Sequence, residues 1–126
     1  MALLSNPMLQ ITISTSSQAD VDAKVDVSLS VFEQFLVNNA GLRLSLRCQL
    51  WGEDGFFNGS DDLQFIFPLQ TVSGNNTFTF AQRLSRSILD EDLGGDEIYA
   101  KFHLFSREQA FPLDVQTRSG TVSGQF

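Results

Sequence analysis

Apolar and polar residues alternate along much of the chain, which is the pattern of a strand with one buried face. Within residues 21–31 every second position is apolar, and aspartate, lysine or serine occupies most of the positions between. Residues 42–50 repeat this pattern, with leucines and Cys48 alternating with arginine, serine and glutamine. Because successive side chains of a strand point to opposite faces, both segments predict strands with one face in water.

Shorter apolar alternations predict further strands, and turn-forming sequences rich in glycine and asparagine separate them. These further strands are expected at residues 9–13, 63–69, 78–80 and 98–104, with a last one that begins at 113–115 and extends toward Val122. Two other apolar segments, residues 31–37 and 84–89, predict single helical turns and do not change the fold class.

About seven short strands at this spacing predict an all-β fold, an antiparallel two-sheet β-sandwich that is immunoglobulin-like or related. A small closed barrel is the alternative. The 126 residues fit a single domain that spans residues 1–126. Cys48 is the only cysteine, so the paired cysteines of true immunoglobulin domains are absent and no family is assigned. Its inward position predicts an inert, buried thiol.

Two acidic segments, residues 53–63 and 90–98, have a similar order of residue types. Each has an acid pair, a turn that contains glycine, a second acid pair and an apolar residue that opens a strand. Nine of the fifteen carboxylate side chains lie in these two segments. Because like charges repel within a short turn, we expect either solvent or a bound cation to offset the repulsion.

Strand counting places the two acidic segments at one end of the predicted sandwich. In an antiparallel sequence of strands, successive connections alternate between the two ends. The connection at residues 16–20 and both acidic segments then share one end, whereas residues 32–41 and 70–76 share the other. The two surface segments therefore become one candidate site.

The chemistry of this candidate site favours calcium, which takes six to eight oxygen ligands from carboxylates, carbonyls and water. Zinc is disfavoured because His103 and Cys48 are the only nitrogen and sulfur ligands of the kind that it prefers. The second segment is similar in part to the calcium-binding loops of C2 domains, although it lacks their aspartate spacing. The alternative is a metal-free, solvated turn that keeps a strand edge from pairing. The candidate ligands are Glu53, Asp54, Asp61, Asp62, Asp90, Asp92, Asp96 and Glu97, with Asn58 as a neutral oxygen donor.

Outward-facing positions of two predicted strands offer a second candidate surface. Exposed aromatic rings at Trp51, Tyr99 and Phe105 would suit carbohydrate stacking or a subunit interface. The alternative is that another part of the chain covers them. The polar residues that accompany them are Arg43, Arg47 and Gln49 on one strand and Lys101 and His103 on the other.

The net charge of −7 argues against nucleic acid as a partner and against a general electrostatic attraction to anionic membranes. No apolar run is long enough for a membrane helix. The first residues do not form a signal peptide, so a cytoplasmic location is expected. His103 has no evident nucleophile beside it, and we therefore expect no enzyme activity.

The sequence thus predicts a non-catalytic binding module with a calcium site at an acidic pole. Its partner is expected to be another protein or a second copy of the chain. A metal-free structural or self-assembling sandwich and a carbohydrate-binding module remain as alternatives.

Overall fold

The computed structural model describes residues 1–53, 61–89, 96–108 and 110–124. Within those residues the chain forms nine strands and two helices. The strands are β1 (Leu3–Ile13), β2 (Gln18–Ser28), β3 (Leu44–Gly52), β4 (Asp62–Ile66), β5 (Gln70–Val72), β6 (Asn76–Ser85), β7 (Asp96–Ser106), β8 (Asp114–Arg118) and β9 (Val122–Gly124), and the helices are α1 (Val31–Asn39) and α2 (Arg86–Leu89).

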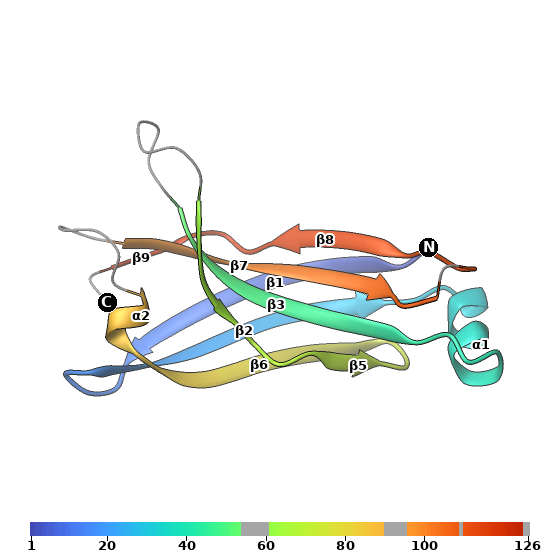
Figure 1. Ribbon diagram of the computed structural model, residues 1–126, viewed down its shortest axis with the longest axis horizontal. Coiled ribbons are helices and arrows are strands. Elements are labelled where there is room, and N and C mark those ends of the chain that lie inside the picture. Colours follow the sequence, from blue (N-terminus) through green and yellow to red (C-terminus); the bar gives the residue numbers. More distant parts are fainter. Residues whose placement is uncertain (54–60, 90–95, 109, 125–126) are drawn as a thin grey trace.

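The strands form two antiparallel sheets that face each other, as Figure 1 shows. Sheet A has the order β1-β2-β6. Sheet B has six strands, with the order β4-β3-β7-β8 and with β5 and β9 as further partners of β3 and β7. The predicted all-β, two-sheet sandwich is therefore confirmed.

The described part of the chain has nine strands instead of the predicted seven or so, for two local reasons. The strand expected at residues 63–69 ends at Ile66, and β5 follows after a break that contains Pro68, which has no N–H to donate to a ladder. The last predicted strand divides into β8 and β9, both of which pair with β7. Between them, the Ser119 N–H donates to the carbonyl of Ala100 at 2.8 Å.

The first strand is longer than predicted, because β1 begins at Leu3 and continues through a proline. Its register with β2 shifts between Ser5 and Met8. Within the shift, Asn6 has a φ of 51°, and Pro7 occupies a position where an irregular ladder needs no donor. Because of this irregularity, β1 continues through a proline-containing sequence that would be expected to end a strand.

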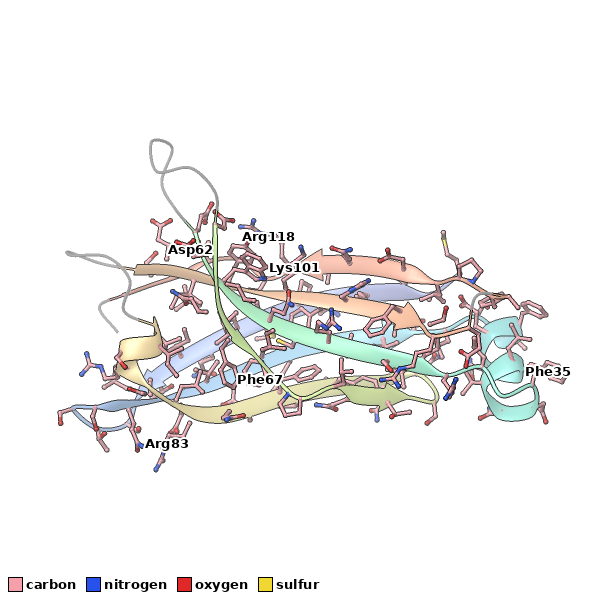
Figure 2. The ribbon with its side chains drawn as sticks, viewed as in Figure 1. Phe35, Asp62, Phe67, Arg83, Lys101 and Arg118 are labelled. Carbon is pink, nitrogen blue, oxygen red and sulfur yellow. The ribbon has the colours of Figure 1, made fainter. Side chains whose placement is uncertain are left out.

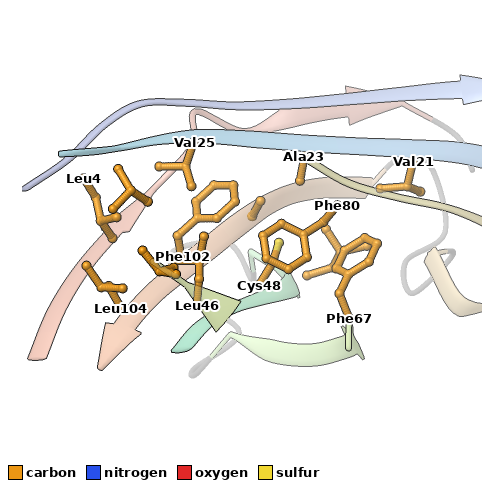
Figure 3. Packing of buried hydrophobic residues seen from close by; sticks show 14 of the residues in the cluster. Leu4, Val21, Ala23, Val25, Leu46, Cys48, Phe67, Phe80, Phe102 and Leu104 are labelled. Carbon is orange, nitrogen blue, oxygen red and sulfur yellow. The ribbon is translucent and has the colours of Figure 1, made fainter. Parts of the chain in front are cut away.

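The core lies between the sheets and is built by the inward halves of the alternating segments. Val25 and Ala23 of β2 face Phe102 and Cys48 across the interior (Figure 3), and all four are fully buried. Burial raises the pKa of the Cys48 thiol well above its usual range, because the thiolate would lose its solvation. The predicted burial of Cys48 is confirmed.

Helix α1 closes one end of the sandwich, opposite α2 (Figure 1). Its N-terminus is a capping box in which Ser30 Oγ accepts from the Glu33 N–H at 3.1 Å and Glu33 Oε1 accepts from the Ser30 N–H at 2.8 Å. Glu33 Oε2 also accepts from the Ala2 N–H at 3.0 Å, so this buried carboxylate ties the start of β1 to the helix. After α1, Gly41 takes a φ of +74°, which glycine adopts without strain.

Candidate functional site

The outer face of sheet B brings together polar and aromatic residues that the sequence places on two separate strands. Arg47 of β3 lies opposite His103 of β7, and Trp51 lies opposite Tyr99 in the same ladder. The residues that alternate with them on β3, such as Cys48, are fully buried between the sheets. The two outward sets that the sequence predicts separately therefore form one continuous face.

Strand β8 extends this face with residues that sequence reasoning missed. Arg118 pairs with Lys101, and Gln116 pairs with His103. A signal was available, because Val115 and Thr117 alternate with Gln116 and Arg118 along the chain. That alternation shows which side chains share a face, but it does not show that β8 lies beside β7.

Three cations on this face each lie over an aromatic ring. The guanidinium carbon of Arg118 is 3.8 Å from the ring centre of Tyr99. Lys101 Nζ is 5.6 Å from the ring centre of Trp51, and the guanidinium carbon of Arg47 is 5.2 Å from that of Phe105. In each pair the cation lies diagonally across from the ring on the neighbouring strand, where long side chains meet. We call these six residues the ring–cation cluster.

Figure 2 shows Lys101 and Arg118 side by side on this face. A cavity of about 320 Å³ opens between β7 and β8 next to them. Its lining residues are Tyr99, Lys101, Gln116, Thr117 and Arg118. The lining brings together one ring, two cations and the amide of Gln116, so the cavity can receive a polar or anionic group.

The expectation that Tyr99 is an exposed ring is wrong. Only 6% of Tyr99 is exposed, because Arg118 covers its ring. Its hydroxyl donates to Asp61 Oδ2 at 2.7 Å. Burial, followed by the hydrogen bond and charge of Asp61, raises the pKa of Tyr99 to about 12, so the phenol stays neutral at physiological pH. Trp51 and Phe105 remain half-buried.

His103 pairs with a carboxylate on the same face. His103 Nε2 lies 2.6 Å from Asp114 Oδ1. The hydrogen bond from Gln116, followed by the one from His103, holds the pKa of Asp114 below its usual range. Asp114 is thus one carboxylate that borders the ring–cation cluster. Glu53, which forms an ion pair with Arg118 at 3.8 Å, is another.

Described parts of both acidic segments meet at the end of β3. Gly52 pairs with Asp62 on one side and with Ile98 on the other. The Glu53 N–H donates to the carbonyl of Glu97 at 2.7 Å. We call this end, with its described carboxylates Glu53, Asp61, Asp62 and Glu97, the acidic pole.

Two of the four described carboxylates of the acidic pole have partners within the protein, since Asp61 accepts from Tyr99 and Glu53 pairs with Arg118. Among the described residues, no three or more histidine, cysteine, aspartate or glutamate side chains are grouped so that they could hold a metal ion. Candidate ligands Asp54, Asp90 and Asp92 and the side chain of Asp96 lie outside the described part, as does Asn58. The calcium site therefore stays a prediction.

Comparison with known proteins gives similarity of fold. No protein-family model matches the chain, and no curated protein matches it. A protein from Archaeoglobus fulgidus, known by its crystal structure, is similar over 98% of both chains with 14% identity and a TM-score of 0.50. The putative ApaA protein from Bordetella pertussis matches 99% of this chain and 93% of its own, with 8% identity and a TM-score of 0.45.

The chain also resembles part of a much larger enzyme. It matches 17% of the length of beta-glucosidase 3B from Thermotoga neapolitana, with 7% identity and a TM-score of 0.41. The similarity to the Archaeoglobus fulgidus protein supports a shared fold, and none of these similarities assigns a function. Among the described residues, no helix is long and apolar enough to cross a membrane.

Proposed function

We propose that this protein is a non-catalytic binding module that recognises an extended, acidic polypeptide segment through the ring–cation cluster. The proposal is based on one observation: three cations, each over an aromatic ring, lie on the same face of the protein. This concentration of positive charge contrasts with the net charge of −7 of the whole chain. The sequence predicts a protein partner, and this proposal adds the surface that would bind it and the chemistry of the bound segment.

The rings hold the cations in position. The Arg118 guanidinium is close enough to the Tyr99 ring to contact it, so part of its conformational freedom is already lost before a ligand arrives. A guanidinium that stacks on a ring still offers its N–H groups to a carboxylate. Binding an anion then costs less side-chain entropy than at a freely moving arginine.

The spacing of the cations favours an extended peptide. Lys101 of β7 and Arg118 of β8 are cross-strand partners, and Arg47 of β3 lies opposite His103, two residues further along β7. Two residues along a strand correspond to about 7 Å. An extended peptide presents alternate side chains at the same interval, so acidic residues at every second position would meet first Lys101 and Arg118 and then Arg47.

Because cations cover the three rings, a neutral carbohydrate is a less favoured ligand than an acidic peptide. A sugar stacks on an open ring face, whereas a cation lies over one face of Trp51, of Tyr99 and of Phe105. Tyr99 is buried as well. An acidic polysaccharide could still use the cations and is included in the test below.

The proposal predicts binding that depends on spacing and salt. We expect the protein to bind a peptide that alternates aspartate and serine, and to bind a peptide with the same composition but adjacent aspartates more weakly. The double variant Lys101→Gln/Arg118→Gln should weaken binding of the alternating peptide about tenfold, equivalent to about 1.4 kcal/mol. Isothermal titration calorimetry at low and physiological salt measures both effects.

The matched control is Lys24→Gln/Arg83→Gln, which removes the same charge from the outer face of sheet A. If both double variants weaken binding equally, the attraction is not local and the ring–cation cluster is not the site. If polygalacturonate binds and neither peptide does, the partner is an acidic carbohydrate. If none of the three binds, the proposed function is wrong.

A calcium site at the acidic pole is a second candidate function, because β3 brings the described parts of both acidic segments together. If calcium binds, the ion at a hundred times its dissociation constant should raise the free energy of unfolding by about 2.7 kcal/mol. Thermal unfolding with millimolar calcium and with chelator measures the shift. Asp92→Asn/Asp96→Asn should abolish it, whereas Asp22→Asn on sheet A should not. An unchanged melting temperature in millimolar calcium would leave the acidic pole as a solvated turn.

A further inference from the structure

The end of the sandwich formed by α1 exposes apolar side chains that the fold does not use. The exposed fractions of Val31, Phe32 and Phe35 are 84%, 61% and 56%. Figure 2 shows Phe35 pointing away from the body of the molecule at this end. Phe111 lies beside them, with its ring centre 6.1 Å from that of Phe32 in an edge-to-face contact. We call these four residues the α1 tip.

The exposure follows from which side of the helix is anchored. Glu33 is buried through its bonds to Ser30 and Ala2, and Leu36 and Val37 pack against the core. Positions three and four residues apart share a helix face, so burial of Glu33, Leu36 and Val37 turns Phe32 and Phe35 outward. The helix is therefore held on one side and presents two aromatic rings to water on the other.

Charged side chains around the α1 tip balance one another. Leu42 donates its N–H to the carbonyl of Leu36, which sets Arg43 next to the end of the helix. The exposed Arg107 donates its N–H to the carbonyl of Arg43, and Glu108 forms an ion pair with Arg43 at 2.7 Å. Together with the buried Glu33, these residues supply two positive and two negative side chains. The net charge of −7 therefore lies elsewhere on the chain.

We infer that the α1 tip inserts into the interfacial region of a lipid bilayer. The patch is a small projecting end, whereas a stable dimer needs about 800 Å² and 20–30 residues from each partner. A second copy would have to supply a pocket that fits the projection. A bilayer accepts a projecting apolar group without a matching shape, and aromatic residues are favoured in its interface.

The inference predicts weak, reversible binding to vesicles of equal parts phosphatidylcholine and phosphatidylserine. Two rings and one valine are too few for permanent attachment, so binding should require excess lipid. Phe32→Ser and Phe35→Ser should each reduce the vesicle-bound fraction about tenfold in co-sedimentation. Neither variant should change the melting temperature much, because both rings are exposed.

The matched control is Ile66→Ser, which removes an exposed apolar side chain of similar exposure from β4. It should leave vesicle binding unchanged. A Phe35→Trp variant in a Trp51→Phe background adds a local readout, because insertion should shift the tryptophan emission to shorter wavelength and allow quenching by brominated lipid.

Two outcomes would overturn the inference. One is the absence of vesicle binding by the full chain at excess lipid. The other is a concentration-dependent increase in mass that Phe35→Ser abolishes, because the α1 tip would then bind a second copy. Neither result bears on the peptide-binding surface, which lies on the outer face of sheet B and is tested without lipid.

Discussion

Phe102→Ala should lower the free energy of unfolding by about 3–5 kcal/mol, the usual cost of removing a buried aromatic ring. Phe102 is fully buried between the sheets, where its ring centre lies 6.3 Å from that of Phe80. The rigid ladder between β3 and β7 cannot close the cavity that the alanine would leave. Urea unfolding, monitored by circular dichroism, measures the change.

Phe105→Ala is the matched control, because it removes the same side chain from the opposite face of the same strand. Phe105 is half-buried and contacts Arg47 and the His103 ring, so the loss should be about 1 kcal/mol. Equal losses at the two positions would contradict the assignment of inward and outward faces on β7.

Glu33→Ala should lower the free energy of unfolding by about 3 kcal/mol at neutral pH. The substitution removes the acceptor of two backbone N–H groups, from Ser30 and Ala2, in a buried setting. Donors left without partners away from water cost about 1–3 kcal/mol each. Glu33→Gln keeps one carbonyl oxygen and should have an intermediate effect. Chemical unfolding of the three proteins tests this order.

The effect of Glu33 should depend on pH. Burial alone would raise its pKa, but the backbone and side-chain hydrogen bonds with Ser30, the amino group of Met1 and the bond from Ala2 together lower the pKa below its ordinary value of 4.5. A lowered pKa in the folded protein means that the ionised group contributes its full stabilisation above about pH 4.5. That contribution is lost as the pH falls through the lowered pKa. The gap between wild type and Glu33→Ala should therefore narrow in acid, and a gap that is constant down to pH 2 would show that the charge is irrelevant.

Alternation was enough to predict the fold class and most of the core, because it records directly which side chains face inward. The inward residues of β2, β3 and β7 were all identifiable in this way. The strand boundaries were less predictable. Neither the irregular step at Asn6 in β1 nor the division of the last strand at Ser119 appears as a pattern, since both depend on the register with a neighbouring strand.

For the candidate site, the sequence predicted which side chains of a single strand face outward. It did not predict which strands lie side by side. Trp51, Tyr99, Lys101 and Phe105 were all assigned to outward positions. Their grouping with Arg118 could not be predicted, because it requires knowing that β8 lies beside β7. The burial of Tyr99 has the same cause, since the group that covers it belongs to the strand that the sequence did not place.

Strand β7 also sets the distance between the two ends of the molecule. It runs from Asp96, which precedes Glu97 of the acidic pole, to Ser106, which precedes Arg107 beside the α1 tip, and its eleven residues extend for about 35 Å. The Debye length at physiological ionic strength is about 8 Å. A negatively charged surface in contact with the α1 tip would thus be separated from the acidic pole by about four screening lengths. The sandwich acts as an electrostatic spacer, so the carboxylates of the acidic pole present little barrier to approach by that end.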